Sequence, residues 1–272
     1  MLWFSVNFIQ TYEGIKESVR LVADNILSQG VIYAEIRFAP QLHKQNNLTQ
    51  EEVIQAALEG LNMTKLKANL ILCCMRGDSN ETDIENEETL ELTKKYLVED
   101  GGVVALDIAG AEALYNTSKY RDLFAKAKEY NVPYTIHAGE ADGPISVKYA
   151  LEFGTKRIGH GVRIYEDPEV VDLVKNENVT LEMCPTSNRY THSIADMSTY
   201  PFMDYLKKGI KVTINTDDMA IERTTLANEF RFMEKNYNLT PEQEKVILLN
   251  SVNAAFTSQE VKEELKKKLN LN

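Results

Sequence analysis

The chain has 272 residues, 43% of them hydrophobic, and its 41 acidic and 30 basic residues give a formal net charge of −11. This length and composition suffice for one sizeable core, and they predict a single domain over residues 1–272. The negative charge argues against nucleic acids and anionic membrane surfaces as partners.

The three cysteines, Cys73, Cys74 and Cys184, show no paired spacing of the kind that binds metals or forms disulfide frameworks. We interpret the neighbouring pair as buried strand residues, which is typical of a reducing compartment, and we expect a cytoplasmic protein. No stretch of about 18 apolar residues occurs, so no membrane-spanning helix is expected.

Apolar spacing and β-branched runs predict an alternation of helices and strands along the chain. The expected strands are residues 31–38, 68–75, 103–109, 132–136, 156–158, 179–184 and 211–216. The expected helices are residues 15–30, a segment from 49 onwards, 87–98, 119–129, 144–153, 168–176, 222–234 and a segment from 241 onwards. Two helix starts carry capping boxes, formed by Thr49 with Glu52 and by Thr240 with Gln243.

Apolar strands that alternate with helices predict a parallel sheet covered on both faces. Seven strand–helix units are visible, which is one short of a closed barrel. An open doubly wound sheet accommodates seven strands, but no glycine-rich phosphate loop follows a first strand.

Titratable side chains follow three of these strands, at the strand ends where barrel and doubly wound enzymes build their active sites. They are His137 with Glu140, then His160 between two glycines, and finally the adjacent carboxylates Asp217 and Asp218. Adjacent carboxylates are costly unless a cation or a proton is shared, so a metal is one natural explanation. The structural alternatives are a core histidine, a turn histidine and a helix N-cap aspartate.

Six segments, in chain order, resemble the adenosine deaminase family. They are residues 33–40, 107–110, 135–140, 157–161, 181–188 and 215–218. The resemblance implies an α/β fold of the (β/α)₈ TIM-barrel type. It also implies one Zn²⁺ ion that activates a water molecule for attack at C6 of a purine nucleoside, with adenosine converted to inosine and ammonia.

The resemblance also implies the roles of individual residues. His137 and Asp217 are expected to bind zinc, and Asp217 also orients the water. Glu140 is expected to protonate purine N1, and His160 to assist as a base and as an electrostatic stabiliser. For the purine itself, Asp218 is expected to bind N7 and the backbone amide of Gly110 to bind N3.

The family pattern contains a His-x-His pair at the end of the first barrel strand, and the 272 residues contain none. A catalytic zinc site normally has three protein ligands, and only two are assigned here. We therefore expect the first strand and helix, with this pair, to lie upstream of Met1. A barrel truncated in this way is expected to bind zinc poorly and to associate through its unpaired edges.

Two alternatives remain open at this point. One is a catalytically inactive truncated barrel that binds purines or acts as an interaction protein. The other is an adenine deaminase or another metal-dependent hydrolase on the same barrel, because a fold does not determine a function.

Overall fold

The computed structural model describes residues 6–271, which form two compact units. The first unit comprises residues 6–110, 122–133 and 256–261, and the second comprises residues 111–121, 134–255 and 262–271. The single domain expected over residues 1–272 stays a prediction.

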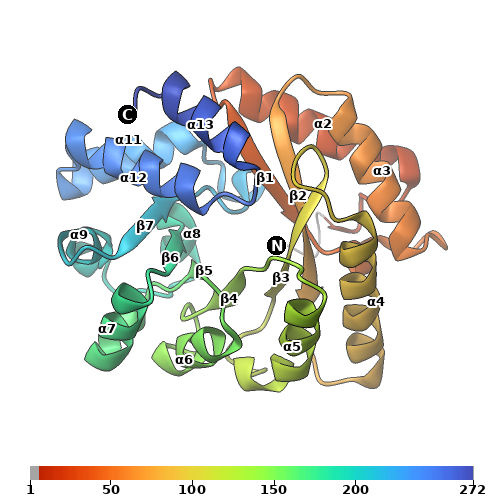
Figure 1. The fold of residues 1–272 in the computed structure, drawn as a ribbon, viewed down its shortest axis with the longest axis horizontal. Coiled ribbons are helices and arrows are strands. Elements are labelled where there is room, and N and C mark those ends of the chain that lie inside the picture. The colour runs from red at the N-terminus through yellow and green to blue at the C-terminus, as the bar shows by residue number, and fades with distance from the viewer. Residues whose placement is uncertain (1–5, 272) are drawn as a thin grey trace. The chain divides into compact units, whose positions relative to one another are not determined.

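The first unit contains a parallel three-stranded sheet in the order β1-β2-β3. Its strands are β1 (Tyr33–Phe38), β2 (Lys67–Met75) and β3 (Val103–Ala109). Its helical segments are α2 (Tyr12–Ser28), η1 (Pro40–His43), α3 (Gln50–Asn62), α4 (Asn80–Tyr96) and most of α5 (Arg121–Glu129). Figure 1 shows α2, α3 and α4 on the outer side of these strands.

Local capping explains where these helices begin. The hydroxyl of Thr49 accepts the amide of Glu52, whose side chain accepts the Thr49 amide in return, so the predicted capping box is confirmed. Helix α4 begins seven residues before the expected start, because Ser79 caps it by accepting the amide of Thr82. The apolar faces of α2 and α3 pack on β1 and β2 to form the core of this unit.

The second unit contains a parallel four-stranded sheet in the order β4-β5-β6-β7. Its strands are β4 (Ile136–Ala138), β5 (Arg157–His160), β6 (Thr180–Met183) and β7 (Lys211–Ile214). Its helices are α6 (Pro144–Phe153), α7 (Pro168–Asn176), α8 (Pro185–Tyr190), α9 (Phe202–Lys207), α10 (Met219–Glu222), α11 (Leu226–Tyr237), α12 (Pro241–Ala254) and most of α13 (Gln259–Lys268), with 3₁₀ turns η2 (Thr117–Tyr120), η3 (Ile164–Glu166) and η4 (Met197–Thr199). The capping box of Thr240 and Gln243 is confirmed at the start of α12.

Two expected elements have different bounds in the structure. The strand expected at residues 132–136 begins later, as β4 at Ile136–Ala138. Pro133 has no amide hydrogen to donate to a neighbouring strand, and only its carbonyl forms a hydrogen bond, which it accepts from the Leu106 amide. The helix expected at residues 222–234 is two helices, α10 and α11. They are separated at Arg223, whose backbone has a φ of 52°.

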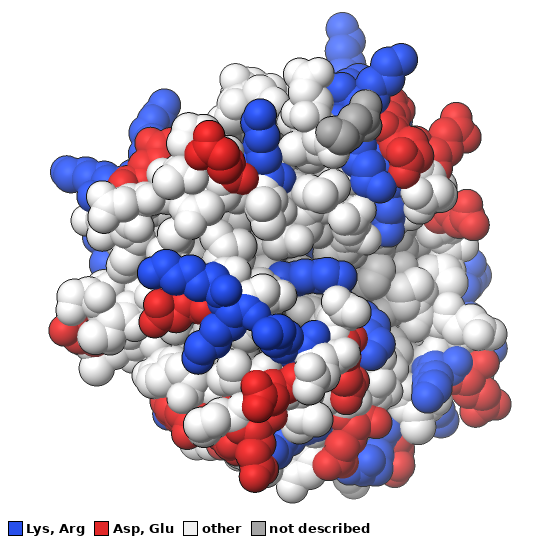
Figure 2. All heavy atoms as spheres, turned by 60° about the vertical axis from the view of Figure 1, so that its left-hand side comes forward, with Lys and Arg blue, Asp and Glu red and all other residues white. Residues whose placement is uncertain are grey.

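Within residues 6–271, seven parallel strands alternate with helices, so the predicted α/β organisation is confirmed. No helix in this part of the chain is both long enough and apolar enough to cross a membrane. On the face shown in Figure 2, lysine and arginine side chains lie across the middle and acidic side chains lie close to them.

Candidate active site

The expected site residues converge at the carboxyl ends of β4, β5 and β7 in the second unit. His137 lies in β4, His160 ends β5, and Asp217 follows β7. The rings of the two histidines lie 5.1 Å apart between centroids. The Nε2 atom of His160 lies 3.6 Å from Glu140 Oε2 and 3.8 Å from Asp217 Oδ2. The structure therefore brings these four predicted residues together.

The glycines beside His160 allow this close approach. A Cβ atom on Gly159 would lie 3.0 Å from Cγ and Nδ1 of His137, and one on Gly161 would lie 2.6 Å from Leu181 Cδ2. His160 and Asp217 themselves have φ angles of 61° and 53°, a left-handed conformation that is unfavourable for residues with a side chain. Such strain is typical of functional sites.

A buried hydrogen-bond chain orients the His160 ring. Tyr200 donates its hydroxyl to Asn188 Oδ1 at 3.0 Å, and the Asn188 amide group donates to His160 Nδ1 at 3.1 Å. With the amide NH₂ group placed toward the ring in this way, Nδ1 accepts and the neutral ring carries its proton on Nε2. All three side chains are buried. His160 therefore presents an N–H donor to the space between Glu140 and Asp217.

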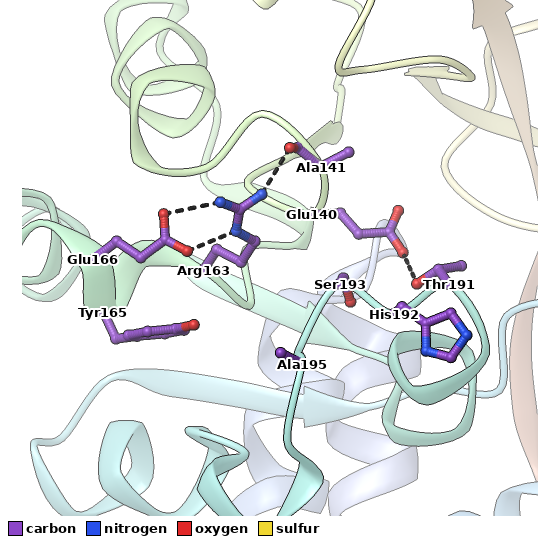
Figure 3. Close-up of a pocket in the computed structure, with 9 residues that line it drawn as sticks. All are labelled: Glu140, Ala141, Arg163, Tyr165, Glu166, Thr191, His192, Ser193 and Ala195. Atoms are coloured by element: carbon purple, nitrogen blue, oxygen red, sulfur yellow. Dashed lines mark hydrogen bonds and ion pairs between the residues drawn. The ribbon is translucent and has the colours of Figure 1, made fainter.

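Glu140 borders a cavity of about 470 Å³ that lies within the second unit. Its Oε1 atom accepts a hydrogen bond from the Thr191 hydroxyl at 2.8 Å, and Figure 3 shows its carboxyl group turned toward that residue. Arg163, Tyr165 and His192 also line this cavity. The volume is in the range of small-molecule sites.

Carboxyl groups gather beside Asp217. Burial and the Asp217 charge raise the pKa of Asp218 to about 6. The same two causes raise the pKa of Glu222 to about 8, and its Oε2 atom is buried with no hydrogen-bond partner among the described residues. Asp218 occupies the N-cap position of α10, but its carboxylate makes no capping hydrogen bond. A bound cation would offset this concentration of carboxylates.

The donor types at this position match those that zinc takes. Ligand atoms of His160, Cys184 and Asp217 lie within 4.8 Å of one another, and the His137 ring packs on that of His160. Imidazole nitrogen, thiolate sulfur and carboxylate oxygen are all zinc ligands. Ser187 donates its hydroxyl to Asp217 Oδ2 at 2.7 Å, which orients that carboxylate as outer hydrogen bonds do in metal sites. His137 and Asp217, the two expected ligands, thus supply donor types that fit zinc, and Cys184 and His160 lie beside Asp217.

Gly110 follows β3 in the first unit and has a φ of 108°. Its expected hydrogen bond to purine N3 stays a prediction, because the site residues above belong to the other unit.

Sequence reasoning assigned no role to Glu112, Asn188, Thr191 or His192, although they hold or line the site. Asn188 lies at the end of the polar segment that follows β6, which is the one local signal for it. The partners of the first three lie 27 to 51 residues away along the chain, beyond the reach of local patterns.

The comparisons with known proteins agree with this geometry. The family model for adenosine deaminase matches residues 1–271. An adenosine deaminase of Haemophilus ducreyi is 43% identical over 266 residues, covering 96% of this chain and 77% of that protein. An adenosine deaminase of Clostridium botulinum is 41% identical over 265 residues, covering 95% of this chain and 78% of that protein.

Two solved structures share the fold. An adenine deaminase of Arthrobacter aurescens has a TM-score of 0.89 at 23% identity, covering 98% of this chain and 82% of its own. An amidohydrolase of Burkholderia ambifaria, solved with bound zinc, has a TM-score of 0.84 at 17% identity, and the match covers 97% of this chain and 77% of that one. The chain thus shares the (β/α)-barrel fold of these structures, and the doubly wound alternative is not favoured.

The match over residues 1–271 and the named relatives show a hydrolase of the adenosine deaminase type, and the strand-end histidines and carboxylates lie where such an enzyme builds its site. The chain belongs to the adenosine deaminase family.

Proposed function

We propose that the chain hydrolyses adenosine to inosine and ammonia with one zinc ion. The observation that carries this proposal is the meeting of Glu140, His160 and Asp217 around one space at the strand ends. The named relatives above 40% identity support adenosine as the substrate. They do not favour an inactive interaction protein or an adenine deaminase.

In this proposal His137 and Asp217 hold the zinc ion, which when bound lowers the pKa of a coordinated water so that it can attack at neutral pH. The Nε2 atom of His160 lies 3.8 Å from Asp217 Oδ2, so its N–H would donate to a water bound beside that carboxylate. The same N–H stabilises the negative charge that develops there. The role of His160 as a base that takes a proton from the water stays a prediction, and it requires the ring tautomer in which Nε2 carries no proton.

Two carboxyl groups act on the purine. Glu140 transfers a proton to N1 as the ring loses its aromatic character, while the Thr191 hydroxyl holds its other oxygen. Purine N7 is an acceptor, so Asp218 binds it in the protonated form. Burial and the neighbouring Asp217 charge raise the pKa of Asp218 to about 6 in the chain without metal, which favours that form. The expected hydrogen bond from the Gly110 amide to N3 stays a prediction.

The substrate class follows from the relatives as well. Adenosine is a small molecule, and Glu140 is the one proposed site residue that also lines the cavity of about 470 Å³. Neither nucleic acid nor a membrane is a proposed partner. Self-association through barrel edges and a cytoplasmic location stay predictions.

The test measures deamination of adenosine, adenine and AMP by the purified chain with added zinc. We expect inosine and ammonia in equal amounts, with adenosine preferred over the other two. Glu140→Gln is the control, and it is expected to lower kcat by roughly 100- to 10,000-fold because it lacks the general acid. Preferential deamination of adenine, or tight adenosine binding without turnover, would contradict the proposal.

A further inference from the structure

Glu112 is a buried carboxylate that binds three consecutive backbone amides. Its Oε1 atom accepts the amide of Gly139 at 2.6 Å, and its Oε2 atom accepts those of Glu140 and Ala141 at 3.0 and 2.6 Å. The residue is only 5% exposed. Three amides that converge on one anion form the kind of concavity that proteins use to bind phosphate or carboxylate groups. Here the anion belongs to the protein itself.

The segment held in this way, residues 139–141, is here called the acid loop, because it carries Glu140. Arg163 holds the same loop through its carbonyl groups. Its backbone amide donates to Gly139 O at 2.9 Å, and its Nη1 atom donates to Ala141 O at 2.7 Å. Glu166 fixes the Arg163 side chain through hydrogen bonds of 2.7 and 3.1 Å (Figure 3).

These contacts determine where the acid points. With the backbone held on both sides, the Glu140 side chain extends to Thr191 and to His160 Nε2. Displacement of a reacting group by about 1 Å can lower a catalytic rate by about 100-fold. The position of this loop therefore bears directly on proton transfer.

We propose that Glu112 is a positioning residue, whose carboxylate organises the acid loop and thereby places the carboxyl group of Glu140 for proton transfer to the purine. This inference rests on the proposed deamination. Glu112 does not itself touch the purine; it acts through the loop. A carboxylate is required because it is an acceptor on both oxygens, whereas an amide at this position would set an NH₂ group against backbone N–H groups.

The test compares the purified wild-type chain with Glu112→Gln, measuring amide hydrogen exchange of the acid loop and steady-state kinetics on adenosine with added zinc. We expect faster exchange at residues 139–141, a kcat lower by about 100-fold, and little change in KM. Glu112→Asp keeps the charge and is expected to recover part of both losses. If Glu112→Gln does not fold, the same two measurements on Glu112→Asp are compared with those of the wild-type chain.

The matched control is Asp100→Asn, which removes a carboxylate that accepts a backbone amide in the first unit, that of Ser258 at 3.1 Å. We expect it to leave loop exchange and kcat unchanged. The proposal is overturned if the Glu112 variants keep wild-type kcat, or if they lower kcat without faster loop exchange. Hydrogen exchange needs no substrate, so a wild-type chain that does not deaminate adenosine would refute the proposed function separately.

Discussion

Asn188 donates a hydrogen bond to Nδ1 of His160 at 3.1 Å, and this contact determines which ring nitrogen carries the proton. The amide oxygen of Asn188 accepts the Tyr200 hydroxyl at 3.0 Å, and its NH₂ group therefore faces the His160 ring. The Nε2–H group of His160 therefore faces the carboxylates of Glu140 and Asp217.

Asn188→Asp is expected to move the proton of the neutral His160 ring from Nε2 to Nδ1, because a carboxylate accepts where the amide donates. Nitrogen-15 NMR of the metal-free chain distinguishes the two tautomers, and the chain has only four histidines. The other three serve as internal references. An unchanged His160 tautomer in the variant would contradict this assignment.

Zinc binding is expected to depend on His137 and Asp217. Replacing either with alanine removes a ligand, so zinc affinity should fall by more than the 10- to 100-fold typical of outer hydrogen-bond partners. The wild-type chain itself is expected to bind zinc weakly, because only two ligands are assigned in it. Equilibrium dialysis with metal analysis measures both. His192→Ala is the control, and retention of wild-type affinity by the Asp217 variant would contradict the ligand assignment.

The buried ion pair of Arg157 and Glu182 supports the sheet of the second unit. The Nε atom of Arg157 lies 2.5 Å from Glu182 Oε1, and both side chains are at least 90% buried. Glu182→Ala leaves a buried charge without its partner and should lower the free energy of unfolding by about 3–5 kcal/mol. Urea denaturation measures this loss. If the free energy of unfolding falls by less than about 1 kcal/mol, the ion pair contributes little to stability and the prediction is wrong.

His43 is expected to make stability depend on pH. Burial lowers the pKa of its imidazole below the ordinary 6.5, although the hydrogen bond from Nδ1 to Ile9 O at 2.6 Å opposes this in part. The unfolded chain therefore binds a proton at a higher pH than the folded chain does. The free energy of unfolding should fall as the pH drops through 6.5, until the folded-state pKa is also passed.

His43→Asn retains a donor at the Nδ1 position and cannot titrate. Urea denaturation between about pH 7.5 and about pH 5.5 should show a shallower pH dependence for this variant than for the wild type. Parallel curves for the two proteins would exclude a contribution from His43.

Elements fixed by local interactions could be predicted from the sequence, and those fixed by distant partners could not. The two capping boxes lie within four residues each, and both are confirmed. The early start of α4 depends on Ser79, which carried no matching acidic residue to signal it. The separation of α10 from α11 at Arg223 depends on a left-handed backbone conformation, which the spacing of apolar residues does not indicate.

The same distinction holds at the site. His137, Glu140, His160 and Asp217 could be found because each follows an apolar strand, and parallel strands bring their carboxyl ends to one edge. Glu112 and Thr191 reach the acid loop across 27 and 51 residues. Nothing near them in the sequence indicates those contacts, which follow from the packing of the second unit.

The most direct test of the central claim is the rate of inosine formation from adenosine by the purified chain with zinc in excess, compared with that of Glu140→Gln. The account predicts turnover by the wild-type chain, with ammonia released in equal amount, and a kcat lower by at least about 100-fold in the variant. Equal rates for the two proteins, or adenosine binding with no inosine formed by the wild type, would contradict it.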